Sequence, residues 1–224
     1  MKKNLTMIVL LAAGICATAN ADTVPVEFKG ISGNYGKRVT IKLSNGLHFA
    51  NGATHIHGWA GQLTHEIDGT DYKTFCTELT QWAGAGDFEI VDVADAPTGL
   101  GMGQAKADAI YRLFNATNQG NDIDSNAKAA AFQATIWEIV YDFGTGGFGI
   151  SEGNVSFHGI NSSLFNTYKD FSANPEGDST PRIVAYSNPD YQDQLGIASV
   201  PLPGAAAMAG LGIGGMGLRR RRRA

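Results

Sequence analysis

The chain has 224 residues, of which 43% are hydrophobic and 17% are charged, and its formal net charge is −4. Seven of its 17 basic residues lie in the first 21 and the last 25 positions, so residues 22–199 hold ten basic and all 21 acidic residues, a net charge of −11. So acidic a region argues against nucleic acid as a partner and fits an extracellular protein, and its length suits one domain with a sizeable core.

The first 21 residues have the three parts of a secretory signal. Two lysines at positions 2 and 3 give a positive start, residues 7–13 (MIVLLAA) form a short apolar stretch, and Ala19-Asn20-Ala21 is a cleavage site with small residues. The sequence therefore predicts a signal peptide over residues 1–21 and an exported domain over residues 22–199.

The two cysteines fall on either side of this predicted cleavage. Cys16 lies within the signal, where Ile15 directly before it does not fit a lipoprotein site. Cys76 is then the only cysteine of the exported domain, which excludes an internal disulfide. An exported protein with one unpaired thiol must bury it, pair it between molecules or use it chemically.

The first part of the domain has the pattern of strands and turns. Alternation over residues 39–43, the turn sequence Asn45-Gly46 and the apolar residues 47–50 predict a strand, a hairpin turn and a returning strand. Further strands are predicted over residues 72–79 (YKTFCTEL) and 87–93. Alternation places Tyr72, Thr74, Cys76 and Glu78 on one face of the first of these.

The hydrophobic period then changes to that of helices. Helices are predicted over residues 104–115 and 127–141, with a polar loop over 118–126 whose end can cap the second, and a short helix and a strand follow over 164–171 and 182–187. These elements predict an α+β fold in which a β-rich N-terminal portion packs on a helical portion.

Gln133 lies at the centre of the apolar stripe of helix 127–141. The stripe is formed by Ala129, Ala130, Ile136, Trp137 and Val140, and the residues on the opposite, polar side are Lys128, Thr135, Glu138 and Asp142. A glutamine amide that faces a core without a partner costs about 1–3 kcal/mol. We therefore expect a specific partner for this amide.

The last 25 residues also have three parts, which are a proline motif with Pro201 and Pro203, an apolar stretch over residues 205–218, and a cluster that includes Arg219, Arg220 and Arg221. The apolar stretch is near the lower length limit for a membrane span, and the arginines predict a cytoplasmic end. This tail, VPLPGAAAMAGLGIGGMGLRRRRR, resembles a PEP-CTERM sorting signal of the VPLPA type from Gram-negative bacteria. The resemblance implies an exosortase as partner, transient anchoring in the inner membrane, and a final place at the cell surface or in a biofilm matrix.

Two further segments resemble the bacterial thioester domain. The first is Phe75-Cys76, the second is residues 132–137 (FQATIW), and residues 189–195 (PDYQDQL) look like the closing segment of such exported proteins. The resemblance implies an internal thioester between Cys76 and Gln133. Phe132 and Trp137 would shield this bond from water beside Phe75, and Glu78 would help to move protons.

This pair of residues has a plausible chemistry. A thiolate is a competent nucleophile, and its attack on the glutamine carboxamide expels ammonia and leaves an acyl–sulfur bond. An amine of a surface protein or a polysaccharide can then replace the sulfur, which predicts covalent capture for adhesion or cross-linking, without turnover, enzyme activity or a cofactor. The alternative is that Cys76 is a small buried hydrophobe and Gln133 is satisfied by backbone hydrogen bonds. The protein would then be a non-reactive structural or carbohydrate-binding matrix protein.

Other candidate sites have weaker patterns. His48, His55, His57 and His65 could include a metal-binding pair, but surface histidines near turns explain them better. Residues 122–126 begin like a calcium loop but lack its glycine and its glutamate, so helix capping is the better explanation. A cysteine hydrolase built on Cys76 and His158 lacks any surrounding signature. No metal site is therefore predicted.

Overall fold

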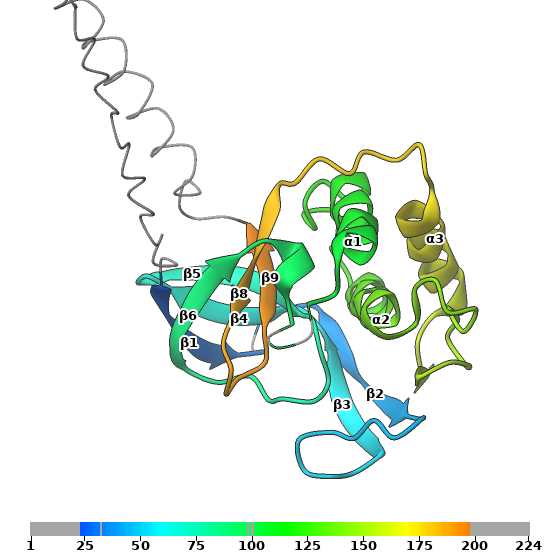
Figure 1. The fold of residues 1–224 in the computed structure, drawn as a ribbon, viewed down its shortest axis with the longest axis horizontal. Coiled ribbons are helices and arrows are strands. Elements are labelled where there is room, and N and C mark those ends of the chain that lie inside the picture. Colours follow the sequence, from blue (N-terminus) through cyan, green and yellow to red (C-terminus); the bar gives the residue numbers. More distant parts are fainter. Residues whose placement is uncertain (1–22, 32, 98, 100, 198–224) are drawn as a thin grey trace, which may run out of the picture.

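A computed structural model describes residues 23–31, 33–97, 99 and 101–197 (Figure 1). The predicted signal over residues 1–21 and the sorting tail over 200–224 lie outside the described residues. In the part of the chain that is described, none of the helices combines the length and the apolar composition needed to cross a bilayer.

Six antiparallel strands form a closed barrel. Their order around the barrel is β1 (Thr23–Gly30), β4 (Leu63–Ile67), β5 (Thr70–Cys76), β9 (Gln194–Ile197), β8 (Ile183–Ser187) and β6 (Gly86–Val91), which pairs again with β1. A single 3₁₀ turn, η1 (Val93–Asp95), follows β6. Closure depends on the two C-terminal strands, because β9 lies between β5 and β8. The barrel is therefore completed only by the end of the domain.

A second sheet has three strands in the order β3 (His55–Gly61), β2 (Gly36–Leu43) and β7 (Val155–His158). The predicted returning strand over residues 47–50 is wrong. After the turn at Asn45 and Gly46, where φ is 55° and 83°, the chain forms a second tight loop in which the Phe49 N–H donates to the Ala53 carbonyl at 2.8 Å. The partner of β2 is therefore β3, which begins only after this loop.

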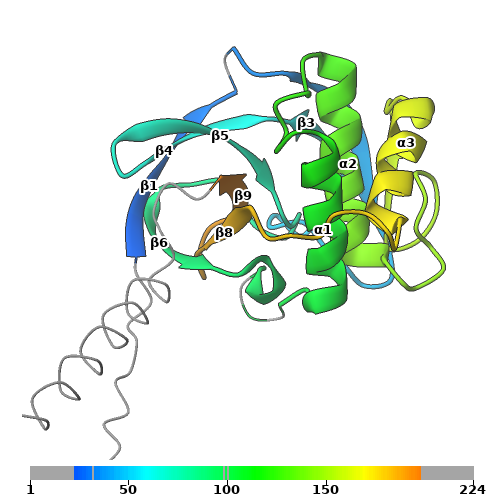
Figure 2. The same cartoon turned by 90° about the horizontal axis from the view of Figure 1, so that it is seen from above.

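Three helices lie beside one another on one side of the barrel (Figure 2). They are α1 (Gln104–Ala116), α2 (Asn126–Asp142) and α3 (Ser162–Ala173). Ser125 caps α2, because its hydroxyl accepts from the Lys128 N–H at 3.3 Å. The predicted helices over 104–115, 127–141 and 164–171 and the predicted strand over 182–187 are confirmed within a few residues.

Beyond its first turn helix α2 is buried on all sides, so the predicted polar face is wrong except at Lys128, which is partly exposed and pairs with Asp124. Thr135, Glu138 and Asp142 are buried along with the apolar stripe. The helix packs between β2 and β3 on one side and α3 and α1 on the other, and the loop before β7 covers its C-terminal end. Its buried polar groups bond locally, since the Thr135 hydroxyl donates to the Ala131 carbonyl and the carboxylates accept from loop N–H groups.

Strand register divides the barrel residues into two sets. Leu63 pairs with Thr74 and Cys76 pairs with Gln194, so these side chains share the inner face. The residue between, Phe75, is on the outer face, where its ring is 4.7 Å from that of Phe132 on α2. The protein thus has a mixed α and β fold in which the outer face of the barrel packs against the helices.

Candidate functional site

Cys76 is the last residue of β5 and lies at one end of the barrel. Its thiol is free, and only 6% of the residue is exposed. Gln133, in the middle of α2, lies on the helix side of Cys76, and this glutamine is completely buried. The two residues that the thioester motifs name are thus neighbours, 57 positions apart in the sequence.

The Gln133 carboxamide pairs with the backbone of Cys76 rather than with its thiol. Its Oε1 accepts from the Cys76 N–H at 3.0 Å, and its Nε2 donates to the Cys76 carbonyl at 2.8 Å. Strand β4 pairs with β5 only as far as Thr74, and Thr77 directs its N–H to Asp193 on the opposite side. The amide therefore occupies the place that a continuing β4 would have taken.

A second glutamine faces the sulfur from inside the barrel. Gln194 on β9 is fully buried, and its Nε2 is 3.9 Å from the Cys76 Sγ and 3.0 Å from the Gln192 carbonyl. Its Oε1 accepts from the Thr74 hydroxyl at 3.3 Å, and the Thr74 oxygen is 2.8 Å from the His65 Nδ1. A continuous row of polar side chains thus leads from His65 to the thiol.

Burial determines the protonation states of Cys76 and Glu78. Desolvation, together with the nearby charge of Glu78, raises the pKa of the Cys76 thiol far above its usual range, so the thiol is neutral at physiological pH. Burial and the charge of Asp193 raise the pKa of Glu78 to about 8. The Glu78 carboxyl accepts from the Asp193 N–H at 2.9 Å and bonds the Thr77 hydroxyl. Glu78 is therefore mostly protonated at neutral pH and titrates about one pH unit above it, close enough for proton exchange.

The predicted shielding residues form two groups around the pair. Phe75 and Phe132 belong to an aromatic cluster with Phe114 and Tyr168, with ring centroids 4.7 to 5.9 Å apart. Trp137 lies on the other side, stacked on Phe157. The phenylalanines thus close the helix side of the site.

Trp137 also lines an apolar cavity of about 280 Å³, and Cys76 forms part of the wall of the same cavity. All three tryptophans of the chain line this cavity, the others being Trp59 and Trp82. Trp82 is 50% exposed and lies at the solvent side, whereas Trp137 is buried. The cavity is therefore a route from solvent to the sulfur that passes between aromatic rings.

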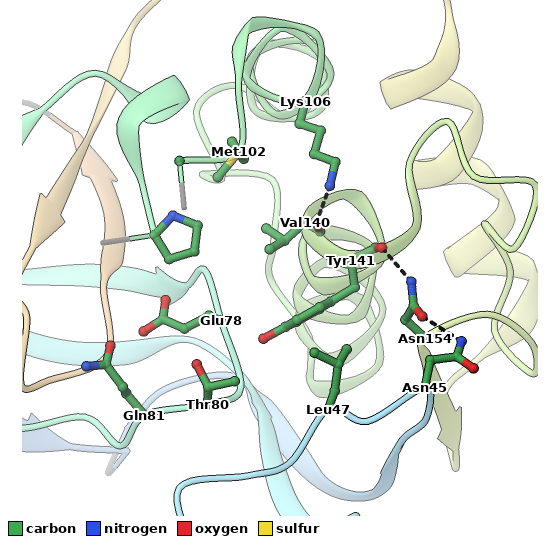
Figure 3. A pocket seen from close by; sticks show the side chains of 12 residues that line it. Asn45, Leu47, Glu78, Thr80, Gln81, Met102, Lys106, Val140, Tyr141 and Asn154 are labelled. Carbon is green, nitrogen blue, oxygen red and sulfur yellow. Dashed lines mark hydrogen bonds between the residues drawn. The ribbon is translucent and has the colours of Figure 1, made fainter. Parts of the chain in front are cut away.

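A larger cavity, of about 580 Å³, lies where the barrel, the helices and the loops of the second sheet meet (Figure 3). Glu78 and Tyr141 converge on it, and Lys106 reaches from α1 to the Val140 carbonyl. Burial lowers the pKa of Lys106 and raises the pKa of Tyr141, whose hydroxyl accepts from the Leu79 N–H at 2.8 Å. Glu78 lines this cavity, whereas Cys76 does not.

The four clustered histidines do not form one site. His55 and His57 lie on β3 with ring centroids 5.8 Å apart, whereas His65 is buried in the barrel and burial lowers its pKa to about 4. Asp124 forms an ion pair with Lys128 at 2.8 Å next to the helix cap, as expected for a capping segment. Within the described ranges no group of three metal-binding side chains occurs.

The sequence motifs led to Cys76 and Gln133, but not to the residues that surround the sulfur. Gln194 lies in the motif-like segment 189–195, which by itself gives this residue no role, and alternation places Thr74 on the face of Cys76 without indicating a function. Trp59 and Trp82 carried no local pattern. Only the pairing of β5 with β9 shows that Gln194 faces the thiol.

Comparisons of the chain with protein-family models, with curated proteins and with solved structures found no match.

Proposed function

We propose that this protein forms an internal thioester between the Cys76 sulfur and the Gln133 acyl carbon and uses it to capture an amine covalently. The observation that carries the proposal is the position of the Gln133 carboxamide. Two hydrogen bonds hold it against the backbone of the one residue of the domain that bears a thiol. A reactive pair needs such fixed proximity, because orientation supplies much of the barrier reduction in acyl transfer.

The proposed chemistry has two steps. In the first, the Cys76 thiol loses its proton, the sulfur bonds to the Gln133 carbonyl carbon, and the carboxamide nitrogen leaves with that proton as ammonia. In the second, a primary amine bonds to the same carbon, the carbon–sulfur bond breaks, and the sulfur takes a proton from the amine. The product is a stable amide between Gln133 and the captured molecule, and Cys76 is a thiol again.

The surroundings of the pair support this chemistry. The aromatic cluster excludes water from the helix side, which preserves an acyl–sulfur bond against hydrolysis. The tryptophan-lined cavity leaves an approach for a slender primary amine, and aromatic faces attract a cationic amine before it loses its proton. Glu78, with its pKa near 8, is a nearby group that can exchange protons with solvent.

The proposed place of action follows from the ends of the sequence. The signal-like residues 1–21 and the PEP-CTERM-like tail over 200–224 support export, handling by an exosortase and a position at the cell surface or in the extracellular matrix. A one-time covalent bond suits such a place, because the protein is not required to turn over there. We therefore propose adhesion or matrix cross-linking, with an amine of a surface protein or polysaccharide as the target.

Intact-mass spectrometry of the exported domain tests the proposal. We expect the protein to be lighter than its sequence by one ammonia, and methylamine to add one equivalent and release the thiol. Cys76→Ala keeps the backbone that binds Gln133 but removes the sulfur, so it should show the full sequence mass and no adduct. A wild-type protein of full mass whose Cys76 alkylates on unfolding, without prior amine treatment, contradicts the thioester.

One observation favours a second candidate, a non-reactive structural or carbohydrate-binding protein. The two hydrogen bonds already satisfy the Gln133 amide without any covalent bond. The large cavity in Figure 3 also combines aromatic, amide and carboxyl groups, as sites for neutral polar ligands do. Under this reading Cys76→Ala changes the stability slightly and leaves ligand binding and matrix association intact.

A further inference from the structure

The row of buried polar side chains inside the barrel has a defined direction of hydrogen-bond donation. The Gln192 carbonyl can only accept, so the group of Gln194 that faces it is the NH₂, and the Gln194 oxygen faces Thr74. The Thr74 hydroxyl donates to that oxygen. The oxygen of Thr74 must then accept from the Nδ1–H of His65.

His65 is suited to anchor this row because its charge state is fixed. Burial lowers its pKa to about 4, so the ring is neutral at physiological pH and carries one proton. Among the described residues its Nε2 has no hydrogen-bond partner, which places that proton on Nδ1, next to Thr74. All links of the row are buried, so water does not compete for them.

We propose that Gln194 is the hydrogen-bond donor that stabilises negative charge on the Cys76 sulfur, and that Thr74 and His65 are positioning residues that keep its NH₂ group facing the thiol. This inference rests on the proposed thioester chemistry. When an amine displaces the sulfur, the electron pair of the carbon–sulfur bond remains on sulfur until the proton arrives from the amine. Gln194 Nε2, at 3.9 Å, donates to that charge at the moment it develops.

The site needs such a donor because its other surroundings oppose a thiolate. Burial and the charge of Glu78 both raise the pKa of the thiol, whereas the hydrogen bond from Gln194 lowers it. Among the described residues, Glu78 just after β5 is the charged group that acts on the thiol, Asp193 just before β9 acts on Glu78, and His65 on β4 ends the row. None of these three provides a positive charge near neutral pH, since His65 is neutral and the others are carboxyls.

Two rates measured on Gln194→Leu test the proposal. Aminolysis of the thioester by methylamine should slow about tenfold, and alkylation of the freed thiol by iodoacetamide after methylamine treatment should shift to higher pH by about one unit, because one hydrogen bond to a charged atom is lost. The control is Gln62→Leu, which removes a buried amide whose bonds go to Tyr35 and Ile123 instead of the sulfur. Unchanged rates and an unchanged pH profile in Gln194→Leu overturn the proposal.

Two matched variants of Thr74 test whether this residue positions Gln194. They also test the proposed role of Gln194 if Gln194→Leu does not fold. Thr74→Ser keeps the hydroxyl and should behave like the wild type, whereas Thr74→Val removes it and should slow both reactions. Equal rates for these two variants contradict the positioning role. The alkylation profile depends only on a free thiol, so it tests Gln194 even if intact mass shows that no thioester forms. An absent thioester thus counts against the proposed function alone.

Discussion

Gln133 takes the place of a neighbouring strand at Cys76. Strand β4 ends its pairing at Thr74, and without the amide two backbone groups of Cys76 would be buried with no partner. The same two hydrogen bonds hold the acyl carbon beside the residue that bears the thiol. One side chain therefore combines a structural role with the chemical role that we propose.

We predict that Gln133→Leu lowers the free energy of unfolding by about 2–5 kcal/mol, because a buried N–H and a buried carbonyl lose their partners. Cys76→Ala should cost less, since it removes a small side chain and keeps both backbone groups paired. Urea denaturation followed by circular dichroism measures both values. An equal or larger loss in Cys76→Ala would contradict the structural role that we assign to the amide.

How far the sequence predicts this site depends on the residue. Cys76 and Gln133 belong to motifs that are visible locally, so the sequence was sufficient to name them. Gln194 is 118 positions from Cys76, and it reaches the sulfur only because β9 pairs with β5. Strand pairing across such a separation leaves no local pattern, so the sequence does not predict that Gln194 and the row behind it lie beside the sulfur.

Helix α2 is the central support of the site, because it carries Gln133 and packs against the strands beside it. Periodicity places Glu138 and Asp142 on an open face, but the loop before β7 covers both. Glu138 accepts from the Gly149 N–H, and Asp142 accepts from the N–H groups of Asn154 and Val155. Periodicity predicts where a helix lies, but it does not show that a loop will cover the polar side. The glycine-rich loop over 144–153 lacked an apolar pattern that would have indicated this cover.

The buried carboxyl of Glu138 makes stability depend on pH. Burial raises its pKa from 4.5 to about 9, so between these values the unfolded chain releases a proton that the folded chain retains. The free energy of unfolding therefore falls as the pH rises through this range, by at most about 1.4 kcal/mol per pH unit for one group. Glu138→Gln should flatten this alkaline loss in urea titrations at pH 5, 7 and 9. An unchanged slope in Glu138→Gln contradicts the assignment.

One hydrophobic core joins the barrel to the helices and to the second sheet. It includes Phe75 and Leu195 from the barrel, Ile41 from β2, and Phe132 and Phe165 from the helices. A smaller cluster of Val24, Val26, Ile67, Phe88, Val184 and Tyr186 fills the barrel interior. The sequence predicts a β-rich part and a helical part. These two parts differ in secondary structure, but they share one hydrophobic core.

We predict that the two parts unfold together. Leu195→Ala removes a fully buried side chain from the strand that closes the barrel and should cost about 2–5 kcal/mol. Because the core is shared, hydrogen exchange should show that amides of the barrel and of the helices lose the same amount of protection. A loss confined to the barrel strands would indicate two independent units and contradict this prediction.

The placement of all three tryptophans around one cavity has a practical consequence. The intrinsic fluorescence of the protein comes almost entirely from the surroundings of Cys76, with one indole near solvent and one deep beside the sulfur. Whatever enters that cavity changes the emission of the whole chain, so occupancy of the cavity can be followed in real time without any label.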